Sequence, residues 1–204
     1  LEELVGLASV LRGTGYPYAS HMRNEDDRLL AAIEEALHVG RLANVPVQIS
    51  HLKAQGQRNY WKADAALKLL EQARADGVDV HFDRYPYTAY ATGLSNLFPS
   101  EYRAGGNQAF LNRLRDSEYA SRLEKACREK VALLGDWNSV QISSTGASTS
   151  WARGGLVGDL ARARGIEAYD LTLELLEENA GSVGMIGHGM SEENTAKILA
   201  HPLG

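Results

Sequence analysis

The chain has 204 residues, of which 21 are basic and 26 acidic, giving a formal net charge of −5. This balance lacks the positive excess that nucleic-acid-binding surfaces carry, so we expect no nucleic-acid partner. A hydrophobic content of 44% suffices for one sizeable core and usually one domain. No apolar run approaches the length that crosses a membrane, so we expect no membrane partner.

The chain contains one cysteine, Cys127, so an internal disulfide is excluded and a reducing, cytoplasmic compartment is favoured. The first residues, Leu1 to Leu4, have no basic region and no apolar stretch behind them, so we expect no signal peptide. The chain starts without methionine and stops at Gly204, just after a helical pattern. We therefore expect both ends to be cut rather than natural.

Helical and strand patterns alternate along the chain. The predicted helices are 4–12, 29–42, 61–75, 108–134, 156–164, 168–179 and 192–200. The predicted strands are 16–20, 45–50, 78–82, 139–143 and 183–186. The stretch 84–106 shows no clear period, and irregular segments of that length are uncommon unless they are functional. The mixed charge cluster at 23–28 indicates a solvated loop or a helix start.

This order of elements argues for an α/β fold with a parallel sheet and crossover helices. A closed TIM (β/α)8 barrel needs eight strands and about 250 residues, so the predicted strands fit a partial barrel. An open doubly wound sheet is the competing architecture. It loses its best support because no Gly-x-Gly-x-x-Gly follows a strand and no Walker sequence is present.

Four of the six histidines lie at or just after the carboxyl end of a predicted strand, and the carboxyl ends of barrel strands line the active-site face. These four are His21, His51, His81 and His188. Of the other two, His38 lies inside a predicted helix and His201 follows one, and both are expected at the surface.

His51 and His81 lie about one strand–helix repeat apart. Adjacent parallel strands are roughly 4.8 Å apart, so two imidazoles at the same height are able to bind one metal ion. The alternative is that each is a hydrogen-bonded barrel histidine, and the residues alone leave both interpretations open.

His21 lies in a segment, Tyr18 to Glu25, that brings a phenol, an imidazole, a guanidinium and a carboxylate together. His21 is a candidate metal ligand, general acid or supporting group. Arg23 is able to clamp a substrate carboxylate by two hydrogen bonds, or to pair with Glu25 or Asp26 as a structural ion pair.

Lys53 either neutralises an anionic substrate or is an ordinary loop lysine. Tyr85 and Tyr87 flank a proline, and they either hydrogen-bond a carbonyl through their hydroxyls or serve packing alone.

Ser143–Ser144 end a predicted strand, but no Gly-x-Ser-x-Gly surrounds them, which argues against a serine nucleophile. Cys127 lies in a charged helical stretch and is expected to be structural.

Three motifs occur in order along the chain: Tyr-x-Ser-His-Met-Arg-x-Glu at 18–25, Ile-Ser-His-Leu-Lys at 49–53 and His-Phe-Asp-x-Tyr-Pro-Tyr at 81–87. In this combination the chain resembles the D-aminoacylase, or N-acyl-D-amino-acid deacylase, family of the amidohydrolase superfamily. Later segments at 142–144, 169–170 and 190–193 share the resemblance.

The resemblance implies a TIM barrel with zinc at its carboxyl face, bound by His51 and His81 at the ends of the fifth and sixth strands. It also implies a substrate pocket lined by His21, Arg23, Lys53, Tyr85 and Tyr87. His188 matches a position near the end of the seventh strand, and its role stays open.

The chain departs from the family pattern in what it lacks. The family's first-strand His-x-His, its third-strand metal-binding cysteine and its small β domain are absent, and its catalytic aspartate is expected after Gly204. We therefore expect 1–204 to be a single partial-barrel fragment, roughly strands four to seven, with no catalytic general base and no deacylase activity of its own.

The implied reaction of the complete enzyme is zinc-dependent hydrolysis of the amide of an N-acyl-D-amino acid, giving a carboxylate and a free D-amino acid. The alternatives are a dipeptidase or cyclic-amide hydrolase on the same barrel, and a non-catalytic truncated barrel. We expect a small-molecule substrate. Half a barrel exposes sheet edges and apolar surface, which would favour self-association.

Overall fold

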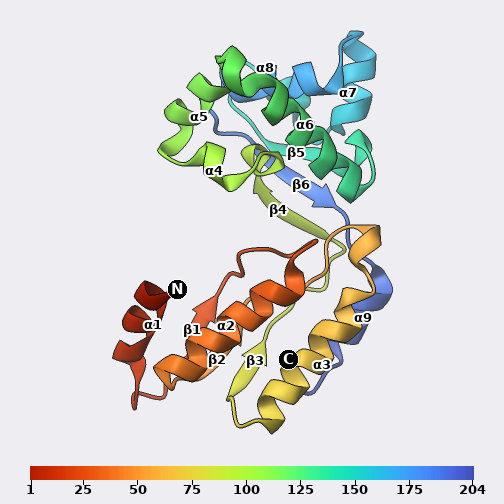
Figure 1. The fold of residues 1–204 in the computed structure, drawn as a ribbon. Helices are drawn as coiled ribbons and strands as arrows, with labels where there is room; N and C mark the ends of the chain where they lie inside the picture. The colour runs from red at the N-terminus through yellow and green to blue at the C-terminus, as the bar shows by residue number, and fades with distance from the viewer. The chain divides into compact units, whose positions relative to one another are not determined.

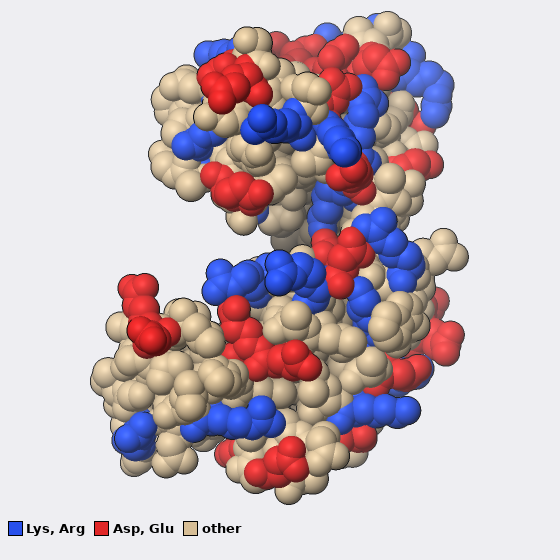
Figure 2. Space-filling view, in the orientation of Figure 1, with Lys and Arg blue, Asp and Glu red and all other residues tan.

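The computed structural model describes all 204 residues, and their contacts divide the chain into two compact units. The first unit consists of Leu1–Thr88 and Met190–Gly204, and the second consists of Ala89–Gly189 (Figure 1). The second unit is therefore inserted in the sequence of the first, between Thr88 and Met190. On the face drawn in Figure 2, basic and acidic side chains are interspersed over each unit. None of the helices combines the length and the apolar character needed to span a membrane.

The first unit is built on a parallel sheet with strand order β1-β2-β3. Its elements in chain order are α1 (Glu2–Ala8), η1 (Ser9–Leu11), β1 (Tyr18–Ser20), α2 (Leu29–Ala43), β2 (Val47–Ile49), η2 (Gln57–Asn59), α3 (Lys62–Ala75), β3 (Val80–Phe82) and α9 (Glu192–Leu199). Helices α2 and α3 are the crossovers that parallel neighbours require.

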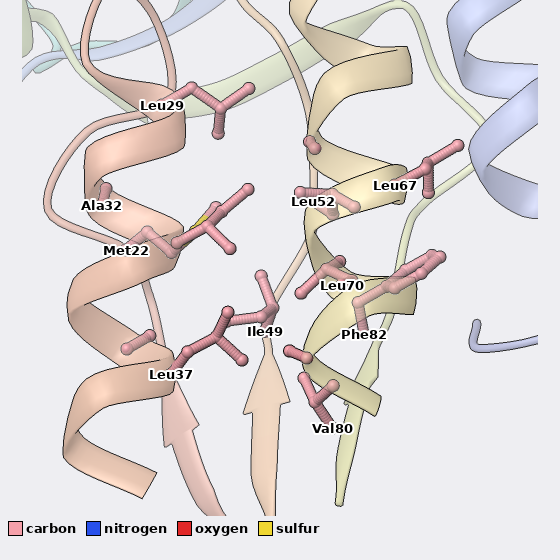
Figure 3. Packing of buried hydrophobic residues seen from close by; sticks show 14 of the residues in the cluster. Met22, Leu29, Ala32, Leu37, Ile49, Leu52, Leu67, Leu70, Val80 and Phe82 are labelled. Carbon is pink, nitrogen blue, oxygen red and sulfur yellow. The ribbon is translucent and has the colours of Figure 1, made fainter. Parts of the chain in front are cut away.

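One face of this sheet is covered by α2 and α3 (Figure 3). Apolar side chains from both helices meet Ile49, Val80 and Phe82 in one buried cluster. Helix α2 comes so close to β2 that a side chain at Gly40 would meet Val47. The alternation of buried and less buried residues along β2 and β3 follows from this one-sided packing.

The opposite face of the sheet carries Ala19, Gln48 and His81, which pair with one another across the three strands. Ala19 and His81 are exposed and Gln48 is partly exposed. A sheet with helices on one face and small or polar residues on the other resembles a sector of a barrel wall. The sheet is not closed, so the partial barrel stays a prediction.

The ends of the first unit pack onto this framework. Helix α1 places Ala8 against a small cluster that includes Val39 and Val45. After α9, the backbone N–H of Phe82 donates to the carbonyl of Leu203 at 3.2 Å. The last residues therefore lie along the free edge of β3.

The second unit has an antiparallel sheet with strand order β4-β6-β5, surrounded by helices (Figure 1). Its elements are β4 (Ala89–Gly93), η3 (Leu94–Leu97), α4 (Ser100–Arg103), α5 (Gly106–Arg115), α6 (Ser117–Leu134), η4 (Trp137–Ser139), β5 (Val140–Ser144), η5 (Ser150–Ala152), α7 (Val157–Arg164), α8 (Ala168–Glu178) and β6 (Gly184–His188). Strands β4 and β6 pair from Ala89 with His188 to Gly93 with Gly184. The unit thus leaves and rejoins the chain through neighbouring strands.

The prediction of a parallel sheet through most of the chain is wrong for the second unit. All its strand pairings are antiparallel, because the chain leaves along β4 and returns along β6 instead of crossing over. Strand β4 was not predicted, since it lies in the stretch that showed no period. The predicted helix 108–134 is interrupted at Asp116, whose carboxylate accepts from the N–H of Glu118 and begins a new helix.

Candidate functional site

The candidate site lies in the loops that follow the three parallel strands of the first unit. His21 comes directly after β1, His51 follows β2, and Asp83 to Tyr85 follow β3. The carboxyl ends of parallel strands meet at one edge of a sheet, and ligand sites in α/β folds occur at this edge. The sequence pattern placed these side chains at strand ends, and the structure gathers several of them.

Two imidazoles and a carboxylate form the centre of the site. Nδ1 of His21 lies 2.6 Å from Nε2 of His51, and the two rings meet edge to face. An oxygen of Glu25 lies 2.9 Å from Nδ1, the other ring nitrogen of His51. One of the two facing nitrogens must carry a proton, because two lone pairs at this distance would repel each other.

A buried ion pair supports this cluster. The ammonium group of Lys53, 3% exposed as a residue, contacts the carboxylate of Glu25. Burial alone would raise the pKa of Glu25, but His51 and Lys53 outweigh it and hold the pKa below the ordinary value. Burial lowers the pKa of Lys53, and the attraction of Glu25 opposes that shift only in part. The pair therefore favours an ionised Glu25.

The backbone of His51 is in the left-handed region, with φ of +44°. Residues with a Cβ rarely adopt this conformation, and it is found at functional sites when the surroundings enforce it. The N–H of His51 donates to a carboxylate oxygen of Asp83 at 2.7 Å. The conformation of His51 thus depends on the loop after β3.

The donor set of the cluster fits a divalent metal ion such as zinc. One ligand atom from each of His21, Glu25 and His51 can be chosen so that all lie within 4.8 Å of one another. Imidazole nitrogens and carboxylate oxygens are the ligands that zinc takes besides thiolates. A cation would replace the proton now shared between the two imidazoles, since ligand nitrogens must present a lone pair.

His81 lies outside this cluster. It pairs with Gln48 inside the sheet, whereas His51 lies beyond the end of β2, beside Asp83. Nε2 of His81 lies 2.9 Å from the guanidinium of Arg74 and 3.5 Å from Asp79. His51 and His81 are therefore not paired across the two strands, and the role of His81 as a metal ligand stays a prediction.

The predicted pocket residues have different surroundings. The guanidinium of Arg23, whose side chain is 69% exposed, pairs at 3.0 Å with Glu35 of α2 rather than with Glu25 or Asp26. The ring of Tyr85 is half-buried, with its centroid 5.5 Å from the Lys53 ammonium.

The remaining candidates are either more exposed or in the other unit. Tyr87 is 67% exposed and lies 6.4 Å from Tyr85, centroid to centroid. His188 ends β6, with Nε2 3.2 Å from the side-chain oxygen of Gln141. Cys127 is buried in the second unit, where burial raises the pKa of its thiol to about 12. This supports a structural role for the cysteine.

The sequence named Glu25 only as an ion-pair partner for Arg23 and did not single out Asp83. Both lie inside the quoted motifs, and both follow predicted strands. Position at a strand end, applied to carboxylates as it was to histidines, would have found them.

Comparison with known proteins gives relatives for part of the chain. It is 43% identical over 93 residues to a D-aminoacylase of Alcaligenes xylosoxydans xylosoxydans, covering 46% of this chain and 19% of that protein. It is 44% identical over 92 residues to an N-acyl-D-glutamate deacylase of the same organism, covering 45% and 19%. No family profile matches the chain.

Solved structures match over almost the whole chain. A crystal structure of N-acyl-D-glutamate deacylase from Bordetella bronchiseptica, complexed with zinc and a phosphonate inhibitor, aligns with a TM-score of 0.73 at 25% identity. The match covers 99% of this chain and 34% of that one. A crystal structure of D-aminoacylase, described as a subset of the amidohydrolases, aligns with a TM-score of 0.68 at 29% identity, covering 98% and 33%.

The chain thus spans about a fifth of the length of its curated relatives and a third of the solved ones. The α/β architecture matches the amidohydrolase structures over nearly every residue. Over the region that it shares with these relatives, the chain is similar to members of the D-aminoacylase family.

Proposed function

We propose that the full-length protein is a metal-dependent amidohydrolase that releases D-amino acids from N-acyl-D-amino acids. The observation that carries this proposal is the cluster of His21, Glu25 and His51 at the carboxyl edge of a parallel sheet. Curated relatives named D-aminoacylase and N-acyl-D-glutamate deacylase support the substrate class.

In this proposal zinc is held by His51, with His21 beside it and His81 as a further ligand predicted from the family resemblance. Bound zinc supplies Lewis-acid polarisation of the acyl carbonyl and an acidified water. A zinc-containing deacylase structure of the same fold supports the choice of ion. Glu25 is less suited to bind zinc directly, because its oxygens already contact Lys53, His51 and Gln55.

The chemistry is addition of water to the acyl carbon, cleavage of the C–N bond and transfer of the water proton to the leaving amine. In this proposal the phenols of Tyr85 and Tyr87, which follow β3, line the substrate pocket and donate hydrogen bonds to the substrate. His21, beside His51, is proposed to contact the reacting group. Arg23 is free to reach a substrate carboxylate only if it leaves Glu35.

Lys53 fits the pocket less well than the sequence indicated. Its ammonium already donates to two internal acceptors, an oxygen of Glu25 and the carbonyl of His51, and lies 2.8 Å from Nδ1 of His51. A substrate carboxylate would have to displace one of them. The electrostatic field of Lys53 at the site remains, even without a direct contact to substrate.

The general base is proposed to come from the segment that follows Gly204 in a longer chain. The hydrogen bond between Phe82 and Leu203 supports this, because it starts such a segment beside β3. The 204-residue chain alone is then expected to have no deacylase activity. A single barrel, a cytoplasmic location and a small-molecule substrate belong to the same proposal.

The test is release of free amine by the full-length protein from N-acetyl-D-methionine, N-acetyl-D-glutamate and N-acetyl-D-aspartate. The L-enantiomers serve as matched controls, and each reaction is run with and without zinc. We expect zinc-dependent release from at least one D substrate and none from its L-enantiomer. No release from any D substrate by a folded, zinc-binding protein would refute the deacylase proposal.

A further inference from the structure

His51 has a positive φ, a backbone conformation that is uncommon for residues other than glycine. Only two other residues with a side chain have positive φ, Asn44 and Ala180, and both follow helices. Asparagine tolerates this region, and helix ends commonly turn through it. His51 instead follows a strand, and hydrogen bonds from its neighbours hold the conformation.

Both backbone groups of His51 are held by charged side chains. Its N–H donates to Oδ1 of Asp83 at 2.7 Å, and its carbonyl accepts from the ammonium of Lys53 at 2.8 Å. The other oxygen of Asp83 accepts from the amide of Gln48 at 2.9 Å. Asp83 therefore ties the loop after β2 both to the strand before it and to the loop after β3.

The ring of His51 is also held by charged side chains. Its Nδ1 lies 2.8 Å from the ammonium of Lys53 and 2.9 Å from a carboxylate oxygen of Glu25. The second oxygen of Glu25 accepts from Gln55 at 2.8 Å, which fixes the carboxylate in turn. With Nδ1 occupied by these groups, Nε2 is the nitrogen that faces His21.

We propose that Glu25, Lys53 and Asp83 are positioning residues that hold His51 with Nε2 aimed at a bound divalent cation. The inference rests on the proposed function, because it takes the ligand of His51 to be a metal ion. Histidine ligands are commonly oriented by a carboxylate on their other nitrogen, and loss of such a partner lowers metal affinity by about 10–100-fold. Here the backbone anchors add a second constraint.

A purely structural ion pair would give a different result from a positioning pair. If Lys53 and Glu25 only stabilise the fold, folded variants would bind metal as the wild type does. Asp83 is the sharper site for the test, because its side chain is exposed and its removal leaves no buried charge. Asp83→Asn keeps an oxygen that accepts from the His51 N–H, so it serves as the conservative variant.

The experiment measures zinc affinity of the full-length protein by competition with a chromophoric chelator. The variants are Asp83→Ala, Asp83→Asn and Lys53→Met, with Lys197→Met as the control. The control breaks an exposed ion pair of the same unit, between Lys197 and Asp64. Circular dichroism checks that each variant is folded, and the visible spectrum of the cobalt-substituted protein reports ligand geometry.

We expect Asp83→Ala and Lys53→Met to lose about 10–100-fold in zinc affinity with an altered cobalt spectrum. Asp83→Asn should recover to within a few-fold of wild type, and the control should not change. Wild-type affinity in folded Asp83→Ala would overturn the positioning role and leave the proposed function standing. Absence of zinc binding by the wild type would overturn both.

Discussion

Replacing Glu25 by leucine is expected to destabilise the first unit by about 3 kcal/mol. Loss of one partner of a buried ion pair costs about 3–5 kcal/mol, because the remaining charge has no compensation. The side chain of Lys53 is 4% exposed and that of Glu25 is 10% exposed, so solvent screens the pair little. The lower end of the range applies because burial already lowers the pKa of Lys53, which makes its neutral form more accessible.

The second half of the same prediction concerns the double variant. Glu25→Leu combined with Lys53→Met removes both charges at similar volume, and such replacements are often neutral or stabilising. We expect the double variant to unfold within about 1 kcal/mol of wild type. A recovery of this kind separates loss of a buried charge from loss of packing.

The assay is hydrogen exchange followed by mass spectrometry in increasing urea, read on peptides from α2 and α3. These peptides report the first unit alone, which matters because the chain has two compact units. Asp64→Ala, which breaks an exposed pair with Lys197, should leave the free energy of unfolding close to that of wild type. A cost below about 1 kcal/mol for Glu25→Leu would refute the reasoning, since an exposed pair would behave in this way.

Three further predictions follow from single positions. The pKa of Glu25 lies below its ordinary 4.5 in the folded protein, so its contribution to stability is complete above pH 4.5 and is lost as the pH falls through the folded pKa. The urea midpoint should therefore fall less steeply with decreasing pH in Glu25→Leu than in wild type, and an equal fall would contradict this. The pKa of the Cys127 thiol is raised to about 12 from an ordinary 9.0. At pH 8, Cys127 in the folded protein should react with iodoacetamide about 1000-fold more slowly than Cys127 in the denatured protein. Comparable rates would contradict its burial. A Cβ at Gly40 would lie 2.1 Å from Val47, so Gly40→Ala should destabilise the protein by about 1–3 kcal/mol. Gly6 in α1 has open space around it, so Gly6→Ala should stabilise the protein by up to about 1 kcal/mol. Thermal unfolding of both variants checks the contrast.

The elements of the first unit could be predicted closely from the sequence. Apolar spacing predicted a helix at 29–42, and α2 runs over Leu29–Ala43. The strands after each helix were also found, because short β-branched runs between amphipathic helices are typical of parallel sheets. Local periodicity was sufficient here, since each strand pairs with its neighbour in the chain.

The second unit could not be predicted in the same way. Its sheet pairs Ala89 with His188, which lie far apart in the chain, and periodicity does not specify such partners. Strand β4 has small and polar residues and one buried side chain, Tyr90, so its pattern is weak. The elements around β5 and β6 were recognised, but their direction was not.

For the site, the sequence identified the residue types but not their grouping. His21 and His51 were both singled out, and the structure brings them together. The pairing of His51 with His81 assumed equal height, but His51 lies beyond the end of β2 in a left-handed conformation that no periodicity indicates. Glu25 was assigned to a solvated charge cluster, and its burial against Lys53 arises only from tertiary packing.

The most direct test of the account is zinc binding by His51→Asn in the full-length protein. Asparagine tolerates a positive φ, so this variant removes the imidazole while keeping the backbone of the loop. We predict that zinc affinity falls by at least about 100-fold in a folded variant. Unchanged zinc affinity would contradict the central claim that His51 binds the metal ion at the carboxyl edge of the sheet.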